Sequence, residues 1–152
     1  MPYIIDGHNL IGKIPDISLS DIDDEFLLIK ILDPHFKRLR KKAIIYFDHA
    51  DLLGKGQIYK SAFLQVIFVR HPKTADQAII EKLKGLRGNA KNFTVVSSDN
   101  WIVSNARKAG ATVIPSEVFY TNFRISHQEA EISGNLTENN IDYWLKIFGS
   151  DS

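Results

Sequence analysis

The chain has 152 residues, of which 44% are hydrophobic, and a formal net charge of +1 at pH 7. This length predicts one globular domain with a substantial core, and the balanced charge excludes a protein that binds nucleic acid through overall charge alone. The chain has no cysteine, so disulfides, thiol catalysis and thiolate zinc sites are excluded, and oxygen atoms or imidazole remain as metal ligands.

The first half of the chain is predicted to begin with a strand at about 2–6, where a short apolar run stands. A helix is expected from near Ser20, with a buried face made of Phe26, Leu27, Leu28 and Ile31. Pro34 is expected to interrupt this helix, because proline has no amide hydrogen to donate to the helical hydrogen bonds. Two β-branched runs then predict strands at about 43–48 and 64–70. The stretch 51–61, which contains two glycines, is predicted to have little regular structure.

The second half opens with a capping box, Thr74-Ala75-Asp76-Gln77, which predicts a helix that ends near Gly88. A strand is expected at about 93–98, a helix from Asp99 to Gly110, and a strand at about 111–114. Residues 124–136 show little pattern, and a last helix is expected at about 137–148. Strands that alternate with helices in this way predict a mainly parallel α/β sheet, in a single domain over residues 1–152.

Four aspartates stand where an apolar run ends or a helix begins: Asp6, Asp48, Asp76 and Asp99. The carboxyl ends of parallel strands meet in one crevice, so these side chains are expected to lie together. Carboxylates in one crevice repel each other unless a cation lies among them, and a site made only of carboxylates favours Mg²⁺ or Mn²⁺. Such an ion can activate water and stabilise the charge of a phosphodiester during cleavage. Taken singly, each aspartate also has an ordinary explanation as a helix cap, a first-turn acid or a turn residue.

Asn9 follows Asp6 by three residues. It is expected either to donate a hydrogen bond to a carboxylate or a substrate oxygen, or to bond local backbone as a turn residue.

Residues 7–14, Gly-His-Asn-Leu-Ile-Gly-Lys-Ile, satisfy most of the phosphate-loop pattern of ATPases. That pattern requires a hydroxyl directly after the lysine, where this chain has Ile14. Ile14 also precedes Pro15, which disfavours the helical conformation that follows a phosphate loop. The ATPase interpretation is therefore rejected.

Four ordered motifs carry a resemblance to a known family: Ile4-Ile5-Asp6-Gly7-His8-Asn9-Leu10-Ile11, Phe47-Asp48, Thr74-Ala75-Asp76 and Ser97-Ser98-Asp99. Over nearly its whole length, the chain resembles the YacP-like branch of the NYN domains, in the PIN-like nuclease superfamily. The resemblance implies a three-layer α/β/α sandwich, a divalent-metal site, and endoribonuclease activity on single-stranded or ribosome-associated RNA. On that pattern Asp6, Asp76 and Asp99 would be the principal metal ligands, and Asn9 and Asp48 would support them as further catalytic residues.

The sequence departs from this family at two histidines. The family usually has tyrosine where His8 stands and a small residue where His49 stands. Each histidine is either a polar loop side chain or a group that stacks on a base or moves a proton near the scissile phosphate.

Two groups of basic residues are candidates for RNA contact. The run 37–42 holds the densest positive charge, but a charge run at a helix end is more often a solvated cap. The second group stands closer in sequence to two of the proposed ligands and is expected to bind phosphates: Lys55, Lys60, Arg70, His71 and Lys73.

The sequence therefore predicts a divalent-metal-dependent endoribonuclease that acts on RNA, with the ribosome as a candidate partner. The alternative is a non-catalytic RNA-binding or protein-binding module on the same scaffold. A phosphatase with Asp6 as its nucleophile would prefer an acid where His8 stands. The sequence has neither an export signal nor the roughly 20 apolar residues of a membrane span, which predicts a cytoplasmic protein.

Overall fold

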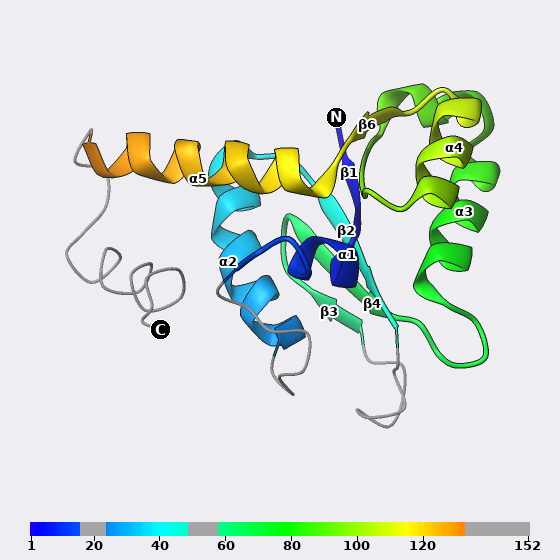
Figure 1. Ribbon diagram of the computed structural model, residues 1–152, viewed down its shortest axis with the longest axis horizontal. Coiled ribbons are helices and arrows are strands. Elements are labelled where there is room, and N and C mark those ends of the chain that lie inside the picture. Colours follow the sequence, from blue (N-terminus) through cyan, green and yellow to red (C-terminus); the bar gives the residue numbers. More distant parts are fainter. Residues whose placement is uncertain (16–23, 49–57, 133–152) are drawn as a thin grey trace.

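The computed structural model describes residues 1–15, 24–48 and 58–132 of the chain (Figure 1). Its centre is a six-stranded sheet in the order β3-β4-β2-β1-β5-β6. The strands are β1 (Tyr3–Asp6), β2 (Ala43–Phe47), β3 (Ile58–Lys60), β4 (Leu64–Phe68), β5 (Thr94–Val96) and β6 (Thr112–Ile114). Neighbouring strands are parallel except for β3, which pairs antiparallel with β4. The predicted mainly parallel sheet is confirmed.

Helices cover both faces of this sheet and make three layers (Figure 1). The helices are α1 (Gly7–Ile11), α2 (Asp24–Leu39), α3 (Ala75–Leu86), α4 (Asn100–Ala109) and α5 (Ser116–Ile132), and a 3-10 helix, η2, spans Arg87–Asn92. One core cluster joins α1, α2 and α5 to the sheet face that carries Ile5, and the other joins α3 and α4 to the face that carries Ile4. The strands are buried on both faces, as is usual in parallel sheets.

The prediction that Pro34 interrupts its helix was wrong, because α2 continues through Pro34 to Leu39. Ile31 and Leu32 before the proline and Phe36 after it are all buried in one core cluster. Burial of each such side chain stabilises the fold by roughly 1.5–3 kcal/mol, which together outweighs the roughly 3 kcal/mol cost of proline in a helix.

The buried face of α2 differs in part from the prediction. Phe26 was expected to be buried, but 42% of its surface is exposed. Leu28 and Ile31 are buried as predicted, so the buried face of the helix is rotated away from Phe26. Ser20, the expected start, lies outside the described residues.

Two stretches that were predicted to have little structure contain regular elements. Strand β3 lies within 51–61, and α5 continues to Ile132 through the stretch that begins at residue 124. The pairing of β3 with β4 depends on contacts across the sheet rather than on local composition. The helix predicted at about 137–148 lies outside the described residues.

The predicted helix ends are confirmed in part. Thr74 and Gln77 form the capping box of α3, and Gly110 ends α4 in the left-handed conformation with φ 90°. Gly88 does not end α3, which stops at Leu86 and passes into the 3-10 helix η2. Within the part of the chain that the structure describes, no helix has the length and apolar character needed to cross a membrane.

Candidate active site

The four predicted aspartates stand at the same edge of the sheet, where the parallel strands end. Asp6 is the last residue of β1, Asp48 follows β2 directly, and Asp99 lies three residues beyond β5. Strands β2, β1 and β5 are neighbours in the sheet, so its topology brings these three residues side by side. Asp76 lies in the first turn of α3.

Asp6 is the most buried of these carboxylates, with 9% of its surface exposed. Its Oδ2 accepts a hydrogen bond from the Ser97 hydroxyl at 3.2 Å. The pKa of Asp6 is raised from 3.8 to about 6, mainly by burial and to a smaller extent by the negative charges of Asp99 and Asp48, against the opposing hydrogen bonds from Ser97 and the Asn9 backbone. Ionisation of Asp6 at neutral pH therefore costs free energy, which a bound cation would offset.

Asp99 caps α4, which was its ordinary structural explanation. Its Oδ1 accepts hydrogen bonds from the amides of Trp101 and Ile102 at 2.9 and 3.1 Å. Because both bonds use Oδ1, Oδ2 has no hydrogen-bond donor among the described residues. The cap thus orients the carboxylate and leaves one oxygen for a ligand.

Asp48 and Asp76 both bind backbone amides at the start of α3. Asp48 Oδ1 accepts a hydrogen bond from the Ala75 amide at 2.5 Å, so a residue that follows β2 holds the first turn of the helix. Asp76 Oδ1 accepts from the Gln77 amide at 2.9 Å and from the Thr74 hydroxyl. The acidic neighbours that raise the pKa of Asp6 are Asp99 and Asp48, so Asp48 shares the electrostatic environment of Asp6.

Asn9 connects two segments that are distant in sequence. Its Oδ1 accepts a hydrogen bond from the Ser98 amide at 2.9 Å and another from the Ser116 hydroxyl at 2.7 Å. These bonds fix the side-chain oxygen. The side-chain nitrogen of Asn9, which can donate two hydrogen bonds, therefore faces away from Ser98 and Ser116. Asn9 is therefore more than a turn residue that bonds local backbone.

Ser97 and Ser116 support the site, although no role was predicted for either of them from the sequence. Ser97 and Ser116 are fully buried, and Ser97 Oγ also accepts the Asp99 amide at 3.1 Å. The position of Ser97, two residues before Asp99, could have indicated its role from the sequence. The contact of Ser116 with Asn9 spans 107 residues, so no local sequence pattern could have indicated it.

A second polar cluster, made of His8, Asp24 and Glu25, lies beside the aspartates. Possible ligand atoms of these three residues lie within 4.8 Å of one another, which identifies a group that could hold a metal ion. His8 Nε2 lies 2.8 Å from Glu25 Oε2, and His8 Nδ1 accepts a weak hydrogen bond from the Asp48 amide at 3.4 Å. This cluster was not predicted from the sequence, because Asp24 and Glu25 are acids in the first turn of α2, where acidic residues are common.

The two acids of this cluster differ in proton affinity. The pKa of Asp24 is raised from 3.8 to about 6, mainly by burial and also by the neighbouring Glu25. The pKa of Glu25 is lowered, because hydrogen bonds with Asp24 and His8 outweigh the opposing effect of burial. The pair can therefore share a proton, with Asp24 as its main carrier.

The predicted RNA-binding residues do not lie together. Arg70 and Lys73 are exposed between β4 and α3, near the aspartates, and Lys73 pairs with Glu81 at 2.7 Å. Lys60 pairs with Gln65 near the start of β4. It therefore lies at the end of the sheet opposite the aspartates, where the parallel strands begin. His8 is half-buried and engaged at both ring nitrogens. Lys55 and His49 lie outside the described residues.

Comparisons with known proteins agree with this architecture. The model of the YacP-like NYN domain matches residues 3–144. The fold is similar to the crystal structure of Rae1 (YacP) from Bacillus subtilis, with a TM-score of 0.65 and 23% identity, over 89% of this chain and 83% of that one. A tryptophan-to-leucine mutant of Rae1 (YacP) gives a TM-score of 0.66 and 20% identity, over 97% of this chain and 91% of that one.

No curated protein sequence matches the chain significantly. The family match covers most of the residues, and NYN domains are PIN-like domains of the nuclease type. The chain belongs to the YacP-like NYN domain family.

Proposed function

We propose that the protein is a divalent-metal-dependent endoribonuclease that hydrolyses phosphodiester bonds of RNA. The observation that carries the proposal is the meeting of Asp6, Asp48 and Asp99 at the ends of three adjacent strands, where burial and like charge raise the pKa of Asp6 to about 6. A cation would compensate this concentration of negative charge. Membership of a nuclease-type family supports the same activity.

The donor atoms of the site fit Mg²⁺ or Mn²⁺, which prefer carboxylate oxygens. In Asp48, Asp76 and Asp99, the hydrogen bonds described above all use Oδ1, so the second oxygen of each remains for an ion. Asp6 and Asp99 would hold the ion with Asp48, and Asp76 stays a further predicted ligand. When bound, the ion would activate water and neutralise charge on the phosphodiester.

The surrounding residues prepare this site for a substrate. Ser97 orients Asp6 and, through the Asp99 amide, ties it to the start of α4. Ser98 and Ser116 hold the Asn9 oxygen, so its amide nitrogen is the group that would donate a hydrogen bond to a phosphate oxygen. Such fixed donors stabilise developing charge without a cost of reorganisation.

The test is cleavage of an RNA with single-stranded and structured parts by the purified protein, with Mn²⁺, Mg²⁺ or EDTA. Cleavage is expected with a metal and not with EDTA, and Asp99→Asn should lower its rate by about 100-fold or more while Asn keeps the helix cap. Glu81→Gln, an exposed acid of α3, is the matched control and should cleave normally. Binding of RNA without cleavage in either metal would support the non-catalytic module instead. Ribosomes added to the reaction would test whether this predicted partner presents the substrate.

A further inference from the structure

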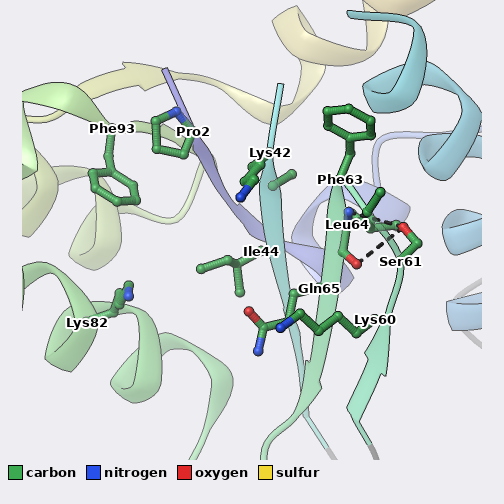
Figure 2. A pocket seen from close by; sticks show the side chains of 12 residues that line it. Pro2, Lys42, Ile44, Lys60, Ser61, Phe63, Leu64, Gln65, Lys82 and Phe93 are labelled. Carbon is green, nitrogen blue, oxygen red and sulfur yellow. Dashed lines mark hydrogen bonds between the residues drawn. The ribbon is translucent and has the colours of Figure 1, made fainter. Parts of the chain in front are cut away.

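A pocket with a volume of about 340 Å³ opens at the end of the sheet opposite the aspartates. It lies where β2 and β4 begin, because its lining includes Ala43 and Leu64, the first residues of these strands. Figure 2 shows Ile44 and Gln65 on the sheet, with Lys60 on one side and Lys82 of α3 on the other. Its volume falls within the range of sites that hold one small ligand or one unit of a polymer.

Three lysines line this pocket: Lys42, Lys60 and Lys82. Among the described residues, no carboxylate pairs with any of them, although Lys13 and Lys73 elsewhere have acidic partners. They come from β3, from α3 and from the residue directly before β2, so the fold rather than a charge run gathers them. Three unpaired cations around one cavity create a positive potential that favours a phosphate.

The rest of the lining has the chemistry that recognises a base. Phe93 and Ile44 are partly buried and offer apolar surface, on which the face of a base can pack. Gln65 is half-buried, and no described residue forms a hydrogen bond with its side-chain amide. An amide can donate to and accept from the edge of a base. Phosphate and base together are the chemistry of a nucleotide.

The pocket and the aspartates lie at two ends of the same sheet face. Ile4 and Ile44 are register partners, and Ile44 pairs in turn with Gln65. Side chains alternate between faces, so Asp6, two residues after Ile4, and Asp48, four residues after Ile44, share the face of Gln65. Six residues separate Lys42 from Asp48, which corresponds to about 20 Å along a strand. About six stacked nucleotides, at about 3.4 Å each, would cover this distance.

We propose that this pocket, which we call the lysine pocket, binds one nucleotide of a single-stranded RNA whose cleaved bond lies at the aspartates. The proposal rests on the proposed function, since it places the substrate strand of that same site. Lysine contacts with phosphate would provide affinity, and Phe93 and Gln65 would receive the base. The strand would run beside α3 and over β4, on the sheet face that carries Gln65.

The test measures affinity for a fluorescent 12-nucleotide single-stranded RNA in EDTA, so that cleavage plays no part. The pocket variant combines Lys42→Ala, Lys60→Ala and Lys82→Ala. The matched control combines Lys84→Ala, Lys91→Ala and Lys108→Ala, which removes three exposed lysines outside the pocket and therefore the same charge. Thermal unfolding of both variants verifies the fold, and Gln65→Glu adds a test by a single substitution that places a negative charge in the pocket.

The pocket variant should bind the RNA about tenfold or more weakly, and its salt slope should fall by about 2, at about 0.7 for each lost phosphate contact. The control should change affinity by less than about twofold. Equal losses in both variants, or no RNA binding by the unchanged protein, would overturn the proposal. Uridine monophosphate that binds as tightly as the 12-mer would identify a free nucleotide as the occupant and also overturn it. A protein that binds RNA through the pocket but never cleaves would refute the nuclease alone, whereas cleavage with unchanged binding of the pocket variant would refute the pocket alone.

Discussion

Asn9 accepts a hydrogen bond from Ser116 at 2.7 Å, across 107 residues of sequence, and this contact ties α1 to the start of α5. The same Asn9 oxygen accepts the Ser98 amide. The fully buried Ser116 hydroxyl would therefore lose its acceptor if the Asn9 side chain were removed.

We expect Asn9→Ala to lower the free energy of unfolding by about 2–3 kcal/mol, because a buried hydroxyl and an amide would remain unsatisfied. Asn9→Asp keeps an acceptor oxygen and should lose less stability, but it replaces the amide donor and should lower cleavage. Urea unfolding and RNA cleavage of both variants test this. Equal stability of Asn9→Ala and the unchanged protein would show that the contact is dispensable.

The raised pKa of Asp6 predicts a pH-dependent effect of Asp6→Asn. The folded protein holds the proton of Asp6 up to about pH 6, whereas the unfolded chain releases it near 3.8. The ionised group therefore costs stability, fully above about pH 6, and this cost disappears as pH falls through the window to 3.8. Asp6→Asn should thus stabilise the metal-free protein by on the order of 2 kcal/mol at pH 7.5 and by almost nothing at pH 3.5.

Urea unfolding at the two pH values measures this difference, with Glu81→Gln as the control acid. A destabilised Asp6→Asn protein at pH 7.5 would mean that the Asp6 carboxylate is a structural requirement rather than a charge held for a ligand.

Metal binding should compete with the proton on Asp6. Because a ligand carboxylate must be ionised, the apparent affinity for Mn²⁺ should fall as pH drops below about 6, the pKa of Asp6. The decrease should approach about tenfold for each pH unit if one proton is released. Calorimetry in two buffers with different ionisation enthalpies counts that proton. An affinity that does not vary between pH 5 and 7 would remove Asp6 from the predicted ligands.

Gly7 should tolerate no side chain. A Cβ at this position would lie 2.3 Å from a ring carbon of Phe47, and Phe47 is fully buried and stacks on Phe68 with centroids 5.3 Å apart. We expect Gly7→Ala to cost about 1–3 kcal/mol and to displace the adjacent Asp6, which would lower cleavage. Gly85→Ala is the matched control, since nothing lies within 4 Å of its Cβ, and it should stabilise α3 by about 0.5–1 kcal/mol. Thermal unfolding would separate the two, and similar values would contradict the predicted clash.

Sequence alone could place the aspartates at one edge of the sheet, because the end of each parallel strand is marked by a local change from apolar to polar residues. It could not place Lys60, which stands near Asp76 in sequence but lies at the opposite end of the sheet through the antiparallel pairing of β3. The cluster of His8, Asp24 and Glu25 was hidden for a similar reason, since the contact of His8 with Glu25 spans 17 residues. Contacts between elements, rather than patterns within them, decide these positions.

Strands β3 and β6 form the two edges of the described sheet, and each is only three residues long. The exposed Lys60 ends β3, and the exposed Thr112 begins β6. Short edges with polar or charged side chains give another chain few backbone groups to pair with. Concentrated solutions of the folded protein should therefore resist aggregation by strand addition.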